Sequence, residues 1–291
     1  MSLSFENKKS LITRITLGTD KFDDAGNNQI TLEGFRTIVD IVKAGGKQMS
    51  TLHAKIYGVK QADMNAITTL AWRALTFIKN RIEVFAIDGV AQTLVFAGNI
   101  INAWGDYNAM PDVYLNIQAS AVYFQRLRPV SPRSFKGQID VASIMNQIAL
   151  DMGLAFENNG VNVQLSDTYL ANTNVTQAED LAQAANIALY IDDKTLAIAP
   201  LNTPRGGAIP LISRDTGLIG YPTFDKVGVN FQILFNPAVQ FGGSVKLETD
   251  LAQANGQWVI TSMSHRLESE KPGGAWFTTL RGTVNELAIS R

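Results

Sequence analysis

Apolar and polar residues alternate with a period of two in four segments between residues 227 and 284. Such alternation is typical of half-buried antiparallel strands, because successive side chains of a strand point to opposite faces. Turn-forming residues separate the segments at Asn236-Pro237, Gly242-Gly243, Asn255-Gly256 and Pro272-Gly273-Gly274. In each segment, alternate residues lie on one face. From the first segment to the fourth, these residues are Val227, Val229, Phe231 and Ile233; Val245 and Leu247; Trp258 and Ile260; and Trp276, Thr278 and Leu280.

The first part of the chain, residues 1–128, also has the pattern of strands. We predict strands over 11–17, 30–42, 49–57, 81–87, 93–101 and 113–121, with a turn at Gly45-Gly46. Over 30–42 the apolar spacing is mixed, so the strands are predicted there from β-branched content, with a break at Gly34. Asp88-Gly89 predicts a hairpin, and Asp63 is the expected cap of a short helix over 64–71. Six or seven strands with one short helix favour a barrel or sandwich.

The middle of the chain changes to an α+β pattern after the extended linker Arg128–Arg133, whose two prolines prevent a helix from crossing it. Asp140 is expected to cap a helix over 141–152 that Gly153 ends. A Thr176/Glu179 capping box predicts a second helix to about residue 186. Strands are expected over 161–165, 189–191 and 195–199, the last two joined around Asp192-Asp193-Lys194. A second linker, Pro200–Gly207, separates this α+β unit, residues 134–203, from a C-terminal unit, residues 208–291.

The order of motifs near the C-terminus is distinctive. Leu234-Phe235-Asn236-Pro237 precedes Gly243-Ser244-Val245, then come Asn255-Gly256-Gln257-Trp258, Ser264-His265-Arg266-Leu267 and Gly274-Ala275-Trp276-Phe277-Thr278. This succession resembles the C-terminal barrel of baseplate hub proteins from long-tailed, chiefly contractile-tailed, bacteriophages. The detailed resemblance covers the last quarter of the chain, and the rest agrees in layout. It implies a mainly β protein in which two tail-tube-like β-barrel domains flank a small α+β domain.

The resemblance also implies partners and a place in the virion. A homotrimer in which each chain carries two similar barrels places six barrels around one axis. Such a ring can meet a sixfold tail tube on one side and a trimeric spike on the other. The expected partners are therefore the tail tube protein, the central spike protein and other baseplate proteins, with DNA only as passing cargo. The expected location is the tail baseplate, assembled in the host cytoplasm.

Composition agrees with a structural role. The formal net charge is -1, from 25 Lys+Arg and 26 Asp+Glu among 291 residues, so no basic field favours nucleic-acid binding over the whole chain. The absence of cysteine excludes disulfides, thiolate metal sites and thiol nucleophiles. The first residues lack the apolar core of a signal peptide, and no apolar run is long enough for a membrane anchor.

The two histidines and the acidic loops are weak candidates for chemistry. A Ser-His-acid triad could use His265 with Glu268 or Asp225, but no Gly-x-Ser-x-Gly elbow accompanies any serine. His53 lies in a strand pattern. The loop Asp20–Asn28 fails the register of a calcium-binding EF-hand. The acid pairs Asp192-Asp193 and Glu268/Glu270 lack the apolar frame that raises a catalytic pKa.

Basic and aromatic residues have ordinary structural interpretations as well. Arg126, Arg128 and Arg133 form a basic cluster around the first linker. A solvated linker explains such a cluster, and a contact with nucleic acid or an acidic partner is the alternative. Neither Gly206-Gly207 nor Gly242-Gly243 opens a helix, so no phosphate cradle is expected. Trp72, Trp104, Trp258 and Trp276 could stack on carbohydrate, but tryptophans in strands more often fill cores.

We therefore expect a structural hub protein with no catalytic, cofactor-binding or metal-binding residues. Three alternatives stay open at this point. The same scaffold could carry a cell-wall hydrolase, a carbohydrate-binding tail-tip module, or the related spike-hub of a bacterial secretion or contractile-injection machine.

Overall fold

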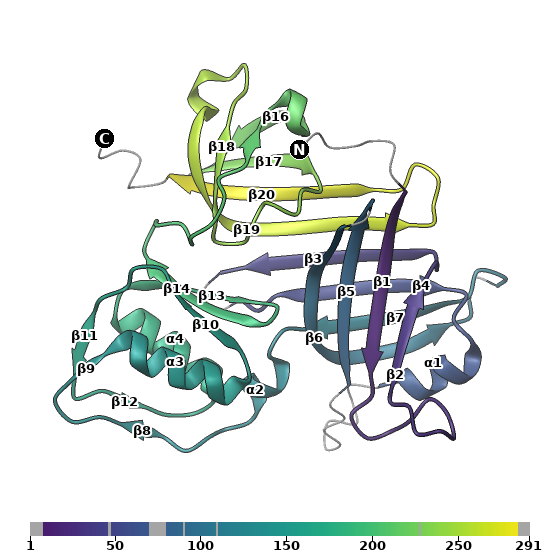
Figure 1. Ribbon diagram of the computed structural model, residues 1–291, viewed down its shortest axis with the longest axis horizontal. Helices are drawn as coiled ribbons and strands as arrows, with labels where there is room; N and C mark the ends of the chain where they lie inside the picture. The colour runs from purple at the N-terminus through teal and green to yellow at the C-terminus, as the bar shows by residue number, and fades with distance from the viewer. Residues whose placement is uncertain are drawn as a thin grey trace.

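The computed structural model describes residues 8–45, 48–69, 80–89, 91–108, 110–226 and 228–284. Figure 1 shows strands from both ends of the chain side by side, with a smaller unit of helices and short strands beside them. The helices are α1 (Gln61–Ile67), α2 (Tyr123–Leu127), α3 (Val141–Met152) and α4 (Asn174–Ala184), with 3-10 turns η2 (Arg214–Thr216) and η3 (Ala252–Ala254). The strands are β1 (Lys9–Thr16), β2 (Gln29–Glu33), β3 (Thr37–Ala44), β4 (Thr51–Tyr57), β5 (Arg81–Asp88), β6 (Ala91–Asp106), β7 (Tyr114–Ser120), β8 (Arg133–Ser134), β9 (Gln138–Asp140), β10 (Ala155–Asn158), β11 (Gln164–Ser166), β12 (Tyr169–Leu170), β13 (Ile187–Asp192), β14 (Thr195–Pro200), β15 (Leu211–Ile212), β16 (Leu218–Phe224), β17 (Val229–Leu234), β18 (Ser244–Leu247), β19 (Gly256–Ser269) and β20 (Trp276–Val284).

One 13-stranded sheet joins the N-terminal and C-terminal strands. Its order is β16-β17-β20-β19-β3-β4-β7-β6-β5-β1-β2, with β15 and β18 attached to one side through β19. The central joint is the antiparallel pair β3–β19, where eight residue pairs run from Thr37↔Ser269 to Ala44↔Ser262. In Figure 1, β1 and β5 cross in front of β3, β4 and β7, so the N-terminal strands fold back into a second layer.

The alternation of side chains decides which face of this sheet is buried. Val39 and Ile41 of β3 lie opposite Leu267 and His265 of β19, and all four side chains are buried. Asp40 and Arg266, one position along, lie on the other face. Because strand residues alternate between faces, one face can pack on a core while the other stays polar.

Three apolar clusters lie beneath and beside the sheet. The first is formed by β1–β7 and α1, together with Phe235, Leu267 and Trp276 from the C-terminal strands. The second holds α3 and α4 against the short strands of the middle segment. The third lies under the C-terminal strands and includes Tyr190 from β13. Apolar contacts therefore cross between the N-terminal and C-terminal strands, and between the middle segment and the C-terminal strands.

The prediction of a mainly β chain with a few helices is confirmed. Asp140 caps α3 by accepting a hydrogen bond from the Ser143 backbone N–H at 3.0 Å, and Gly153 ends that helix at a φ of 72°. Gly34 separates β2 from β3 with a φ of 75°, a value that suits glycine. The hairpins at Asp88-Gly89 and at Asp192–Lys194 also form where they were predicted.

Both other predicted caps are wrong. α1 begins at Gln61 after Lys60, so Asp63 lies inside the first turn instead of capping it. α4 begins at Asn174, and Thr173 accepts the capping bond from the Thr176 N–H, one turn earlier than the predicted box. Each error arose because an acceptable capping residue lay a few positions after the true start, and helix boundaries are the least certain part of a sequence pattern.

Several strands were missed or shifted. β15 and β16 carry no regular alternation, since Gly220 and Pro222 interrupt β16. The predicted strand over 161–165 shifts to β11, whereas β19 runs unbroken from Gly256 to Ser269, between the turns that the sequence predicted. The described strands do not close on themselves into a barrel at either end of the chain. Gly46, Val227 and the predicted helix beyond residue 69 lie outside the described residues.

Candidate functional surface and buried junction

The exposed side of the large sheet between β6 and β16 is one candidate surface, which we call the sheet face. Directly paired strand residues point to the same side, so the register places Asn102, Gln118, His53, Asp40 and Arg266 in one row across five strands. The face continues over β20 and β17 through the paired positions Thr279↔Gln232 and Arg281↔Asn230. Polar side chains from both ends of the chain thus form one surface.

Charges on and beside the sheet face are paired with one another. Arg266 bonds Asp40 and also reaches Glu268, whose carboxylate is 2.7 Å from the Lys271 Nζ. Desolvation raises the pKa of Glu268, but the hydrogen bond from Lys271 and its other donors outweigh it and hold that pKa below its ordinary value. Further along, two more pairs are Arg281 with Asp225 at 2.7 Å, and Lys55 at 5.0 Å above the Tyr114 ring. The charged side chains of the sheet face are therefore close to balance, and they share the face with apolar Val42, Phe277 and Leu234.

A buried ionic cluster lies under the sheet, and we call it the buried junction. The Lys43 Nζ of β3 contacts the Asp192 and Asp193 carboxylates at 2.6 Å each. Arg205 lies 3.5 Å from Asp192 and 2.7 Å from Glu157 of β10. Charges buried this deeply persist in proteins when they are paired and hydrogen-bonded.

The pKa values in the junction follow from burial and pairing. Burial alone would lower the pKa of Lys43, but the two carboxylates outweigh burial and raise it. Burial would likewise raise the pKa of Asp192, yet Lys43 and Arg205 bring it below its ordinary value. Burial raises the pKa of Asp193 to about 6 against the attraction of Lys43. Lys43 and Asp192 are therefore an ion pair at neutral pH.

The junction ties the middle segment to both sets of strands. Asp193 accepts a hydrogen bond from the Ala97 N–H of β6 at 3.0 Å, and Lys194 contacts Glu83 of β5 at 2.6 Å. Arg205 donates to the Phe241 carbonyl at 3.0 Å, in the loop before β18. The hairpin tip between β13 and β14 thus contacts strands of the first cluster directly, and Arg205 links Asp192 to Phe241 of the third cluster. No sequence pattern predicts the contact between Lys43 and Asp192, because the two residues are 149 positions apart in the chain.

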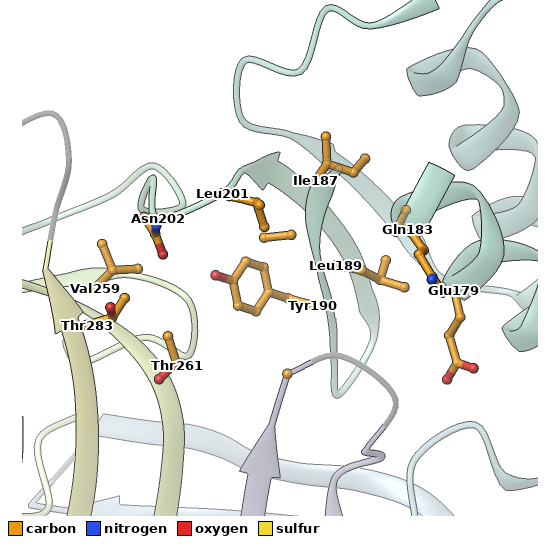
Figure 2. Close-up of a pocket in the computed structure, with 13 residues that line it drawn as sticks. Glu179, Gln183, Ile187, Leu189, Tyr190, Leu201, Asn202, Val259, Thr261 and Thr283 are labelled. Carbon is orange, nitrogen blue, oxygen red and sulfur yellow. The ribbon is translucent and has the colours of Figure 1, made fainter. Parts of the chain in front are cut away.

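An apolar cleft of about 380 Å³ lies between the middle segment and the C-terminal strands. Figure 2 shows Tyr190 of β13 pointing its hydroxyl towards Thr261, Val259 and Asn202, with Leu189 and Ile187 on the far side. Burial raises the pKa of Tyr190 above its ordinary value. Since the described lining residues include no histidine and one carboxylate, Glu179, they offer no nucleophile with a base beside it.

The candidate triad does not assemble. His265 is buried, and its Nδ1 lies 2.9 Å from the Thr278 hydroxyl. Burial lowers the pKa of His265 to about 3, with the charge of Lys43 acting in the same direction. Glu268 is held by Arg266 and Lys271 instead. His265 is therefore a neutral core side chain beside the junction, whereas His53 is exposed on the sheet face.

The other predicted candidates have structural partners. Asp23 in the loop 20–28 accepts hydrogen bonds from the Asn27 backbone and side chain, and the described residues contain no group of three metal-ligating side chains. Glu270 pairs with Lys8 at 2.7 Å. The prediction that Asp192-Asp193 are turn residues without an apolar frame is wrong: both are buried against Lys43, and burial raises the pKa of Asp193 to about 6.

Two of the three linker arginines are engaged within the chain. Arg126 contacts Glu179, and Arg133 bonds Asp151, whereas Arg128 is exposed. Trp258 is buried and donates its indole N–H to the Ala254 carbonyl at 2.8 Å, and Trp276 packs against Phe235 in the first cluster. Trp104 is half-buried beside a small hollow of the sheet face, and Trp72 lies outside the described residues. No helix among those that are described is long and apolar enough to cross a bilayer.

A family model described as Baseplate hub gp41 matches residues 24–279. The chain belongs to the baseplate hub gp41 family. It is thus a structural component of the phage tail baseplate, as the ordered C-terminal motifs had indicated. None of the curated protein sequences matches this hub protein.

Solved structures share the fold of the hub protein at low sequence identity. A tail protein from Neisseria meningitidis MC58 has a TM-score of 0.65 and 10% identity, covering 97% of this chain and 98% of its own. The 43 kDa tail protein of prophage MuSo2 from Shewanella oneidensis has a TM-score of 0.61 and 10% identity, and the match covers 98% of both chains. The E. coli c3393 protein is a type VI secretion component described as similar to T4 tail proteins gp27 and gp5. It has a TM-score of 0.58 and 9% identity, and the match covers 87% of this chain and 74% of its own.

Proposed function

We propose that this hub protein is a homotrimer that joins the tail tube to the central spike and to other baseplate proteins, and that DNA passes through its centre. The observation that carries the proposal is the continuous sheet face, built by both ends of one chain and joined at β3–β19. Three such sheets around an axis would give a wall of six units, because each chain contributes one N-terminal and one C-terminal group of strands. That wall would match a sixfold tube while keeping true threefold symmetry for a spike.

The strand order supports two related units within the chain. Outward from the joint, one side has the hairpin β3-β4 followed by β7-β6, and the other has the hairpin β19-β20 followed by β17-β16. Each side therefore sets two antiparallel hairpins next to each other in the same order. We propose that residues 1–128 and 208–291 are two related tube-like β units, each contributing open strands to the large sheet, and that residues 134–203 form the α+β insert between them.

The charge on the sheet face suits a wall along which DNA passes. A wall rich in unpaired Lys and Arg would bind phosphates and hold the DNA, because each neutralised phosphate releases counterions. Here Arg266 and Arg281 are each paired with a carboxylate. The wall would let the duplex slide past without a preferred stopping point.

The direct test is the mass of the purified full-length chain, measured by sedimentation or light scattering, together with negatively stained images. We expect a species of three times 31.7 kDa that appears as a ring with a central hole. A monomer at every concentration, or a trimer with no hole, would contradict the trimeric channel while leaving the family membership in place.

We further propose that the hub protein has no enzymatic activity. The acidic side chains Glu268 and Glu270 each contact a lysine, so neither is held in the apolar frame that a general acid needs. Incubation with peptidoglycan should release no fragments. Fragments that disappear in the Glu268→Gln or Glu270→Gln variants would establish a cell-wall hydrolase instead.

A further inference from the structure

One edge of the small sheet β10-β14-β13 has no strand beside it in the described part of the chain, because β13 pairs with β14 alone. Leu189 of β13 lies opposite Ile198 of β14, whose carbonyl accepts a hydrogen bond from the Asn159 N–H on the β10 side at 2.8 Å. Pairs along an antiparallel ladder alternate between bonded and non-bonded ones. Leu189 and Ile187 therefore direct their backbone N–H and C=O groups away from β14, and no described residue bonds those groups there.

This open edge faces the apolar cleft of about 380 Å³. The four successive residues Ile187, Ala188, Leu189 and Tyr190 all line the cleft. Figure 2 shows Leu189 and Tyr190 pointing to opposite sides of the strand, so the cleft runs along the edge itself. Unpaired main-chain groups at a sheet edge bind an extended segment by adding it as a further strand. The cleft therefore suits one extended piece of polypeptide.

The strand β20 leads the chain to this cleft. Thr283 of β20 lines it together with Val259, its pair on β19, and Figure 1 shows β20 ending on the same side of the molecule as β13 and β14. The next seven residues, 285–291, lie outside the described residues. An extended chain spans about 3.3 Å per residue, so a segment of that length can run along all six residues of β13.

The sequence of residues 285–291, NELAISR, matches the lining of the cleft. Leu287 and Ile289 are alternate residues, and in an extended continuation of β20 they share the side of Thr283, which faces the cleft. No proline or glycine in the segment opposes strand pairing. The cleft is lined by one charged side chain among the described residues, Glu179, which Arg126 contacts. An apolar occupant thus meets no unpaired charge.

We propose that residues 285–291 lie in the cleft as an added strand on the edge of β13, with Leu287 and Ile289 against its apolar walls. The occupant is this segment of the same chain, because it starts at the cleft and is held there at high effective concentration by β20. The added strand ties the middle segment to the C-terminal strands through main-chain hydrogen bonds. This contact goes beyond the proposed hub function and does not depend on the trimer.

Hydrogen exchange of the β13 backbone, measured residue by residue on the full-length chain, tests the added strand. We expect the N–H groups of Ile187 and Leu189 to be protected in the wild type. Leu287→Asp combined with Ile289→Asp should raise their exchange rates at least about tenfold, because a charge without a partner is unfavourable in an apolar cleft. The matched control is Ala288→Asp combined with Ser290→Asp, which adds the same two charges at the alternate positions and should leave the rates unchanged.

The exchange outcomes are distinct. Protection that only the first variant loses supports the added strand. Equal rates in all three proteins, or an equal loss of protection in both variants, would overturn it. Exchange in β4 and β7 reports whether the rest of the fold is intact, and it should be the same in all three proteins.

Cysteine pairs provide a second test that needs no charge in the cleft. The chain has no cysteine, so Ala188→Cys can be combined in turn with Leu287→Cys and with Ile289→Cys. Under mild oxidation we expect at least one pair to form a disulfide within a single chain of 31.7 kDa. Tyr169→Cys with Ile289→Cys is the control, since Tyr169 of β12 is 66% exposed and does not line the cleft; it should keep both thiols.

The mass of the oxidised product identifies the occupant. A disulfide within one chain supports the proposal. Covalent dimers would place the segment in the cleft of a second copy and overturn the assignment to the same chain. Linkage in neither test pair, or equal linkage in the control, would overturn the contact altogether.

Discussion

The buried junction and the sheet face use the same ion-pairing side chains in opposite surroundings. The Lys43 side chain is 6% exposed between its two aspartates, whereas Arg266 and Asp40 are 48% and 46% exposed. Water and salt screen the second pair and barely reach the first. The comparison teaches that an ion pair under the sheet holds parts of the chain together, whereas one on the sheet face mainly sets the local charge.

The largest effect is expected from Lys43→Met, which keeps the length of the side chain and removes its charge. Asp192 and Asp193 would then lie buried together without their shared cation, and only Arg205, 3.5 Å from Asp192, would remain beside them. Removing one partner of a buried pair costs about 3–5 kcal/mol, so we expect the free energy of unfolding in urea to fall by roughly that amount. An unchanged denaturation midpoint would mean that the two carboxylates are solvated or protonated, and that the junction does not hold the three clusters together.

The next effect is a change in pH dependence at His265, which faces the junction from β19. The pKa of His265 is about 3 in the fold and about 6.5 in an unfolded chain. Between these values the unfolded chain binds a proton at His265 and the folded chain does not, so acidification weakens the fold. We expect the wild type to lose roughly 2 kcal/mol more than His265→Gln between pH 7.5 and pH 5.

Other ionisable groups of the junction do not change this expectation for His265. Burial raises the pKa of Asp193 to about 6, so its contribution to stability is present at low pH and is lost as pH rises through about 6. Both proteins keep Asp193, Asp192, Lys43 and Arg205. The contributions of these residues to the pH dependence of stability therefore largely cancel when the unfolding free energies of the two proteins are subtracted. Parallel pH profiles for the wild type and His265→Gln would contradict the buried neutral state of His265.

A smaller loss is expected when the junction is neutralised as a whole. Lys43→Met combined with Asp192→Asn and Asp193→Asn removes the uncompensated charges that Lys43→Met leaves behind. Neutral replacements of buried ion pairs are often close to neutral in stability. We expect the triple variant to recover more than half of the loss of Lys43→Met in the same urea measurement. A triple variant less stable than Lys43→Met would show that specific hydrogen bonds, such as that from Ala97, outweigh the charges.

Sequence patterns predicted the sheet face better than the junction. Alternation within β4 and β17 and the β-branched content of β3 depend only on residues near in the chain, so these strands could be anticipated. The junction depends on β3 meeting a hairpin tip 149 residues later, and Asp192-Asp193 alone has the composition of an ordinary turn. β16 was missed for a related reason, because Gly220 and Pro222 break the alternation that marks a strand.

The smallest effect is expected on the sheet face itself, from Arg266→Gln. Arg266 contacts Asp40 and Glu268 across β3 and β19, but exposed ion pairs contribute only about 0.2–1 kcal/mol. We therefore expect a fall in unfolding free energy within that range, and a smaller one still at high salt, where screening already weakens the pair. Lys43→Met, measured in the same salt series, should keep most of its effect. If both variants lost stability equally and with the same salt dependence, burial would not be what separates the two regions, and the junction would be as open to water as the sheet face.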